Sequence, residues 1–141
     1  MTIKVCVAGI TGWTGSAVGK AVSAADDMQL VAAVARSAAG QDVGTSLGLD
    51  ASGVVISSTV KEALAGDVDV FVDYTSAEAV LDNVLVAIDA GVNVVIGSSG
   101  LTAADFEKIE AAAKGKDATV ISCGNFSITA ALAKRFSLMA A

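Results

Sequence analysis

The chain has 141 residues, which suits one domain with a sizeable core. Hydrophobic residues make up 54% of it and aromatic residues only 4%, which is typical of an α/β protein whose parallel strands are buried on both faces. The net charge of −6 argues against general nucleic-acid binding. Because the sequence has neither an apolar run of membrane-spanning length nor a basic leader, we expect no membrane association and a cytoplasmic location.

The first predicted strand, residues 3–8, stops at a glycine, and a predicted helix follows at residues 13–25. Gly9, Gly12 and Gly15 follow one another at three-residue spacing. This pattern is typical of a buried strand followed by a helix whose N-terminus receives a phosphate. Gly9 would permit a tight turn, Gly12 a close approach of a pyrophosphate, and Gly15 close packing of the helix. Glycine turns without a ligand share this spacing, so the motif alone leaves both interpretations open.

The second predicted strand, residues 29–35, is followed at once by Arg36 and Ser37. At this place an acidic residue binds the ribose 2′-hydroxyl of NAD, whereas a basic residue pairs with the 2′-phosphate of NADP. Arg36 therefore predicts NADPH as the preferred cofactor over NADH. The alternative is that Arg36 is a solvated residue at the start of a long loop over residues 37–53.

The rest of the chain continues the alternation of strands and helices. Further strands are predicted at residues 54–57, 68–74, 92–96 and 118–122. Further helices are predicted at residues 60–64, 77–90, 103–113 and 128–141. Their predicted N-terminal caps are Thr59 with Glu62, Ser76, and Thr102 with Asp105.

This alternation predicts a Rossmann-like, doubly wound parallel sheet in three layers, within a single domain over residues 1–141. Right-handed crossovers give the five main strands the order 3-2-1-4-5, with residues 68–74 as the third strand. Ligands of such sheets bind beyond the carboxyl ends of the strands. Five loops with unusual residues follow those ends: residues 9–15, 36, 74–75, 97–100 and 124–127. We therefore expect a dinucleotide site at this edge of the sheet.

Few residues in the chain are suited to acid–base or metal chemistry. The chain has no histidine, so it lacks the commonest general acid–base and metal ligand, and we expect no metal site. Cys6 and Cys123 lie in apolar strand patterns, and we expect both to be buried structural thiols without a disulfide. Asp73 ends a strand and is expected to be a structural acid.

Four segments in order resemble the N-terminal domain of the dihydrodipicolinate reductase family, which acts in lysine and diaminopimelate biosynthesis. They are residues 9–15 (GITGWTG), 73–75 (DYT), 95–101 (VIGSSGL) and 125–127 (NFS). The resemblance covers nearly the whole chain. It implies a reductase that transfers a hydride from NADPH or NADH to a small cyclic dicarboxylate.

The resemblance also implies roles for individual residues. Gly9, Ile10, Thr11, Gly12, Trp13 and Thr14 would hold the pyrophosphate, and Arg36 the phosphate on the adenosine ribose. Tyr74 and Thr75 would border the cofactor. Gly97, Ser98 and Ser99 would line the nicotinamide, with Ser99 near the substrate. Cys123, Gly124, Asn125 and Phe126 would close over the nicotinamide through backbone contacts, although Phe126 could instead be a hinge residue in the core.

The sequence departs from the family pattern at several points. Trp13 and Thr14 stand where the family has a basic residue and Met, which puts one phosphate contact in doubt. The loop in this form also resembles semialdehyde dehydrogenases that reduce acyl phosphates, although Cys123 lacks their Pro-Gly-Cys context. Residues 97–100 read GSSG in place of GTTG and keep both hydroxyls.

The family's substrate domain carries a His-His pair and a Lys, and this chain has no histidine. We therefore expect the cofactor half alone, with catalytic residues in an absent domain and little activity of its own. In the family the tetramer forms through that domain, so a homo-oligomer is a possible state of the whole protein. Two other interpretations stay open: a stand-alone NADP-binding regulatory module, and a fragment of an acyl-phosphate-reducing semialdehyde dehydrogenase.

Overall fold

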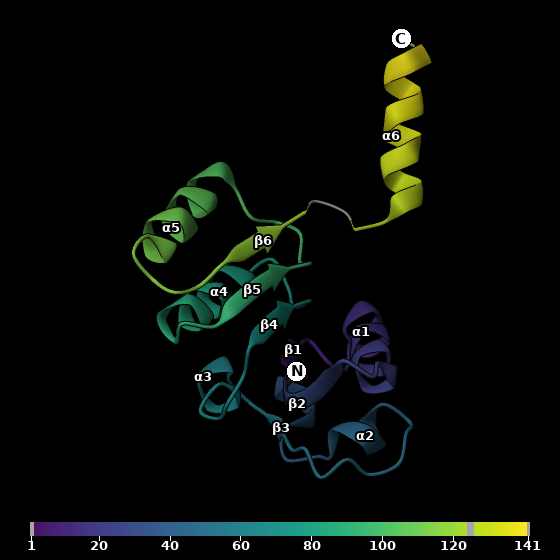
Figure 1. Cartoon of the computed structure of the whole chain (residues 1–141), viewed down its shortest axis with the longest axis vertical. Helices are drawn as coiled ribbons and strands as arrows, with labels where there is room; N and C mark the ends of the chain where they lie inside the picture. The colour runs from purple at the N-terminus through teal and green to yellow at the C-terminus, as the bar shows by residue number, and fades with distance from the viewer. Residues whose placement is uncertain (1, 124–125, 141) are drawn as a thin grey trace.

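The computed structural model describes residues 2–123 and 126–140, and a six-stranded sheet forms its centre (Figure 1). The strands are β1 (Ile3–Ala8), β2 (Met28–Val34), β3 (Ile56–Ser57), β4 (Val70–Asp73), β5 (Asn93–Ile96) and β6 (Val120–Ser122). The helices are α1 (Trp13–Ala24), α2 (Val43–Ser46), α3 (Val60–Ala63), α4 (Val80–Asp89), α5 (Ala103–Ala113) and α6 (Ile128–Ala140), with a 3₁₀ turn at Arg36–Ala38. All paired strands of the sheet are parallel, which confirms the predicted Rossmann-like doubly wound fold.

The strands lie in the order β3-β2-β1-β4-β5-β6, so the predicted order was wrong in one respect. The strand expected beside β2, here β4, instead pairs with the other side of β1, from Val5 opposite Val70 to Ala8 opposite Asp73. The short strand β3 takes the place beside β2. The prediction had left this two-residue strand out of the main sheet, and counting it as the third strand gives the usual doubly wound order.

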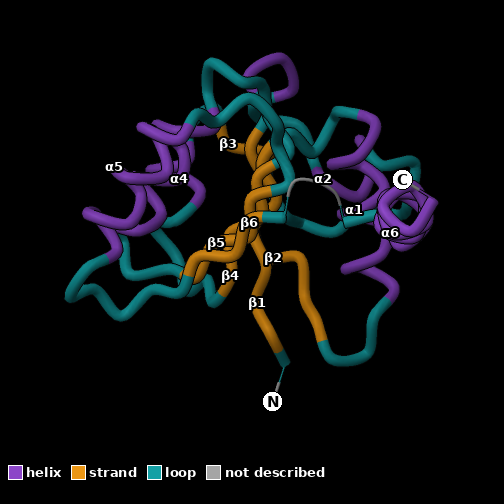
Figure 2. The backbone as a smooth tube through the Cα atoms, turned by 90° about the horizontal axis from the view of Figure 1, so that it is seen from above, coloured by secondary structure: helices purple, strands orange, loops and turns teal. Residues whose placement is uncertain are grey.

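The core has two parts, one on each face of the sheet. On one face Cys6, Ala8 and Phe71 pack with residues of α3, α4 and α5. On the other face Val5, Val7 and Val72 pack with residues of α1 and α2. Because both faces of β1 are covered, its buried residues 5–8 form an uninterrupted apolar run. Figure 2 shows the resulting three layers, with α4 and α5 on one side of the sheet and α1 and α2 on the other.

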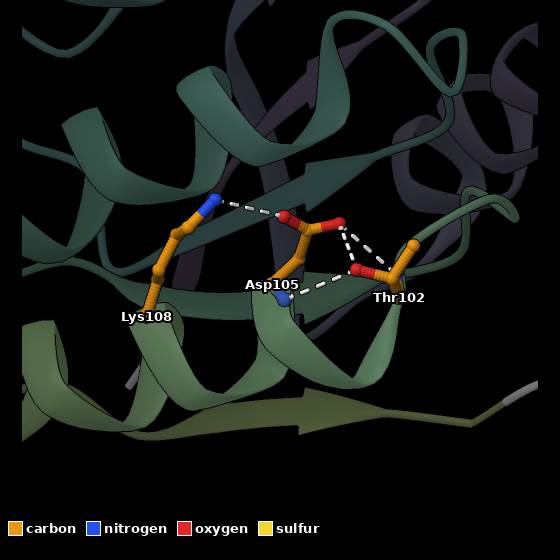
Figure 3. Close-up of polar contacts among 3 residues, drawn as sticks. All are labelled: Thr102, Asp105 and Lys108. Carbon is orange, nitrogen blue, oxygen red and sulfur yellow. Dashed lines mark hydrogen bonds and ion pairs between the residues drawn. The ribbon is translucent and has the colours of Figure 1, made fainter.

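The predicted capping boxes of α3 and α5 are both present. At α5 the Thr102 hydroxyl accepts the Asp105 N–H, and the Asp105 carboxylate accepts the Thr102 N–H at 3.0 Å (Figure 3). Lys108 donates to the other carboxylate oxygen of Asp105 at 3.2 Å. Thr59 and Glu62 make the same reciprocal pair at α3. These local bonds satisfy N–H groups that have no partner inside the helix.

Helix α4 begins later than predicted. Ser76 was the expected cap, but the helix begins at Val80, with Ala79 at the capping position and no side-chain cap. Residues 77–79 form a turn in which the Ser76 carbonyl accepts the N–H groups of Ala79 and Val80. The segment 74–79 is therefore free to form part of the edge at which the strands end.

Helix α6 stands apart from the three layers (Figure 1) and has no buried residue. Leu132, Phe136 and Met139 on this helix are all well exposed. Within residues 2–123 and 126–140, no helix is long and apolar enough to cross a bilayer.

Candidate dinucleotide-binding site

The glycine loop between β1 and α1 folds back on itself. Gly9 has a φ of 78°, a left-handed conformation that favours glycine. Its N–H donates to the Val34 carbonyl at 2.9 Å, and its carbonyl accepts the Gly12 N–H at 2.8 Å. A Cβ atom on Gly9 would overlap the Tyr74 carbonyl, and one on Gly15 would overlap the Gly9 carbonyl. The first and third glycines therefore let three backbone segments pack together.

The N-terminus of α1 is open. Its capping residue is Gly12, no side chain caps it, and its first turn carries no acidic residue. A helix N-terminus presents unpaired N–H groups and a partial positive charge, which together favour an anion such as a phosphate. Thr11, Trp13 and Thr14 lie exposed around this end, with Trp13 99% exposed. The Ile10 side chain is buried in the core, so only its backbone could contact a ligand.

A cavity of about 700 Å³ extends from the glycine loop across the ends of β2 and β4. It brings together Gly9, Thr11, Gly12, Arg36, Tyr74 and Thr75 from the predicted site. Its other walls come from α3 and α4 and include Ser58, Thr59, Lys61, Glu78, Asp82 and Asn83. No pattern in the sequence indicates that these six residues line the site, because only the fold brings α3 and α4 to this edge.

The cavity carries charges of both signs. Arg36 and Lys61 stand on the β2 and α3 side and are both exposed, and neither forms an ion pair within the described part of the chain. Glu78 and Asp82 stand on the α4 side. A hydrogen bond from the Ser76 side chain holds the pKa of Glu78 below its ordinary value, so this carboxylate is charged at neutral pH. The cations of the cavity thus lie on its β2 and α3 side, and the carboxylates lie on its α4 side.

Asp73 connects two of the loops at this edge. It is fully buried, and its carboxylate accepts hydrogen bonds from Thr75, Asn83 and Ser98. The Asp73 carbonyl also accepts the N–H groups of Gly97, at 2.9 Å, and Ser98, at 3.1 Å. This agrees with the expected structural role of Asp73. In the sequence, this role is indicated by the position of Asp73, an acidic residue at the end of an apolar strand.

Of the residues expected around the nicotinamide, those that the structure describes do not line the 700 Å³ cavity. Gly97 and Ser98 are half-buried beside Tyr74 and Asp73, and Ser99 is exposed. Phe126 is 46% exposed, so it is not a core residue. Gly124 and Asn125 lie outside the described residues.

The two cysteines differ from each other. Cys6 is buried as expected, and burial raises its pKa to about 12, which makes it an inert thiol. Cys123 is exposed, so the expectation that it is buried was wrong. It follows β6, which is the last strand of the sheet and has Ile121 half exposed. Within the described residues, no three His, Cys, Asp or Glu side chains are grouped so that they could hold a metal ion.

Comparison with protein families places this site in a known context. The family model described as the N-terminus of dihydrodipicolinate reductase matches residues 3–126. The 4-hydroxy-tetrahydrodipicolinate reductase of Thermosynechococcus vestitus is 36% identical over 143 residues, which cover 98% of this chain and 52% of that protein. The enzyme of the same name from Moorella thermoacetica is 32% identical, over 99% of this chain and 53% of that protein. The chain spans about half the length of these curated relatives.

Solved structures with a similar fold include a member of the same family. A dipicolinate-bound dihydrodipicolinate reductase from Paenisporosarcina sp. TG-14 superposes with a TM-score of 0.81 and 26% identity, over 99% of this chain and 54% of that one. GenD2 from gentamicin A biosynthesis, solved in complex with NAD, has a TM-score of 0.73 and 28% identity, over 89% of this chain and 35% of that one. The fold is therefore one that binds nicotinamide dinucleotides.

Proposed function

The chain belongs to the dihydrodipicolinate reductase family through that family's N-terminal domain, and we propose that it supplies the cofactor-binding half of such a reductase. The observation that carries this proposal is the cavity that joins the glycine loop, Arg36 and Thr75 beside the open N-terminus of α1. We propose that the pyrophosphate lies at this N-terminus, where the absence of side chains on Gly9 and Gly12 leaves the backbone accessible. Thr11 borders the same space and offers a hydroxyl.

We further propose that NADPH is preferred over NADH. Arg36 begins the 3₁₀ turn that follows β2 and is separated from that strand only by Ala35. In dinucleotide-binding folds the adenosine ribose lies at this place. Lys61 lines the same cavity from α3, and Ser58 also lines it. Two cations without an ion-pair partner suit a phosphate that carries about two negative charges. No acidic residue follows β2 to bind a 2′-hydroxyl.

We propose that the whole protein reduces a small cyclic dicarboxylate in lysine and diaminopimelate biosynthesis. The nicotinamide, when bound, supplies the hydride. At the nicotinamide end of the cofactor, residues 97–99 would hold the nicotinamide ring. The exposed Ser99 would lie on the side of the substrate. We propose that backbone groups of Cys123 and Phe126 border the nicotinamide ring. Residues that clamp the dicarboxylate and donate a proton belong to the remainder of the reductase.

The cofactor preference is tested by measuring dissociation constants of the chain for NADPH and NADH by nicotinamide fluorescence. Arg36→Ala and Lys61→Ala each remove one cation from the 2′-phosphate, so each should weaken NADPH binding roughly five- to tenfold and leave NADH binding almost unchanged. Lys20→Ala is the matched control, because Lys20 is exposed on α1 and does not line the cavity. Tighter binding of NADH than of NADPH by the unchanged chain would contradict the preference, as would equal losses for both cofactors in the variants.

A further inference from the structure

The buried carboxylate of Asp73 is unusual in this fold. It is the one polar or charged side chain among the described residues that is buried with the core. Its Oδ1 accepts the Thr75 N–H at 2.9 Å, the Thr75 hydroxyl at 2.8 Å and the Ser98 hydroxyl at 2.6 Å. Its Oδ2 accepts the side-chain amide of Asn83 at 2.9 Å. Burying a carboxylate is costly unless its oxygens are satisfied, and here several hydrogen bonds replace water.

The same residues fix the loop that follows β5. Ser98 donates its N–H to the Asp73 carbonyl and its hydroxyl to the Asp73 carboxylate. A Cβ on Gly97 would overlap the Tyr74 ring, and one on Gly100, whose φ is 106°, would overlap the Ala77 side chain. Three of the four residues 97–100 are therefore packed against the last residue of β4 or the segment that follows it. Ser99 is exposed and makes none of these contacts.

We propose that Asp73 is a positioning residue for the nicotinamide end of the cofactor, which it aligns by holding Ser98 and thereby the loop 97–100. This inference rests on the proposed function. Asp73 itself is fully buried, so it acts through Ser98 and not by contact with the cofactor. Its carboxylate instead holds the Ser98 hydroxyl, so that the exposed Ser99 presents its own hydroxyl at the surface of the loop.

The cluster also explains how the two halves of the site keep their relative positions. Thr75 and Asn83 line the cavity assigned to the adenosine half, and both bond to the same carboxylate as Ser98. Asn83 further donates to the Thr75 hydroxyl at 3.2 Å. Removing the Ser98 hydroxyl loosens the loop on the nicotinamide side alone, because the Thr75 and Asn83 bonds to the Asp73 carboxylate remain. The backbone bonds of Gly97 and Ser98 to the Asp73 carbonyl also remain, so the loop stays attached but less well fixed.

The test compares two ligands that share the adenosine half. NADPH carries a nicotinamide, whereas 2′,5′-ADP carries the adenosine and its 2′-phosphate without one. Ser98→Ala should weaken NADPH binding roughly tenfold, because it breaks a hydrogen bond to a charged group, and change 2′,5′-ADP binding by less than about twofold. A role only in stability would move both affinities together. Ser23→Ala is the matched control, since the Ser23 hydroxyl donates to the Gly19 carbonyl within α1, away from the site.

Asp73→Asn provides a second variant, because an amide cannot accept from every donor around this carboxylate. If it folds, it should shift the ratio of the two dissociation constants in the same direction as Ser98→Ala. Equal losses for both ligands in Ser98→Ala, or no loss for either, would overturn this inference and leave the proposed function standing. Failure of the unchanged chain to bind either ligand would overturn both.

Discussion

The three glycines of the loop after β1 have separate physical tasks. Gly9 adopts a left-handed φ and touches the backbone of Tyr74, whereas Gly15 touches the carbonyl of Gly9. The sequence analysis assigned the turn to Gly9 and close packing to Gly15, and the structure bears out both. It adds that the partner of Gly15 is the Gly9 carbonyl. The role of Gly12 near a pyrophosphate stays a prediction.

Gly15 is the sharpest place to test this packing. Replacing an interior helix glycine by alanine usually stabilises a helix by up to about 1 kcal/mol. Gly15→Ala should instead destabilise the chain by about 1–3 kcal/mol, because the new methyl group would overlap backbone rather than a flexible side chain. Urea unfolding measures the difference. Gly66→Ala is the control, since nothing lies within 4 Å of a Cβ at that position; equal stability of the two variants would disprove the packing argument.

Other residues of the site could not be read from the sequence. Lys61 is one of several charged residues on short helices, and only the placement of α3 beside β2 brings it into the cavity with Arg36. Asp73 is an acid at the end of an apolar strand, which indicates a structural role but not its partners. Asn83 and Ser98 are 10 and 25 residues away from it. Contacts at such separations depend on the order of the strands.

Among the elements, the segment between β2 and β3 is the least regular. It was predicted as a loop and contains the 3₁₀ turn, α2 and a tight side-chain cluster at Asp42. The Asp42 carboxylate accepts the N–H groups of Thr45 at 2.9 Å, Ser52 at 3.1 Å and Gly53 at 2.7 Å. These bonds, that of Thr45 foremost, lower the pKa of Asp42 from 3.8 to about 2. The Asp42 side chain thus connects the start of α2 to residues 52–53, which follow that helix.

This cluster predicts a pH dependence of stability. Because the pKa of Asp42 is lower in the folded than in the unfolded chain, its contribution is complete above about pH 4 and is lost as the pH falls toward about 2. Asp42→Ala should therefore lower the melting temperature at pH 7, and the difference from the unchanged chain should shrink between pH 4 and pH 2. Asp50→Ala is the control, since no side-chain hydrogen bond of Asp50 occurs within the described residues. A difference that is constant with pH would contradict the assignment.

The alternation of elements could be predicted because apolar runs, glycines and capping boxes are local signals. Two predictions about the elements, the place of β3 and the start of α4, were wrong because the local sequence pattern is weak there. The strand β3 has two residues, too few for a periodic pattern, so its place beside β2 was missed. Ser76 resembles a cap, but the residues before it are held by the Asp73 cluster and the helix starts four residues later. In both cases tertiary contacts outweigh local preference.

At the scale of the molecule, the chain places its ligand-suited residues at one edge of the sheet. A second cavity of about 650 Å³ lies between α5 and β6, lined by Phe106, Ile109 and Val120 among others. It contains one acidic and one basic residue, Glu110 and Lys114, and lies apart from the glycine loop. The second cavity is therefore an alternative binding site against which the proposed dinucleotide site at the glycine loop can be tested.

The most direct test is therefore to map NADPH binding on the isotope-labelled chain by NMR. Amide shifts should change at Gly9, Gly12, Thr75 and Ser99, with saturation as NADPH is added, and stay unchanged at Ile109 beside the second cavity. Such a pattern would place the cofactor across the ends of β1, β4 and β5. Changes confined to the groove between α5 and β6, or no change at saturating NADPH, would contradict the account.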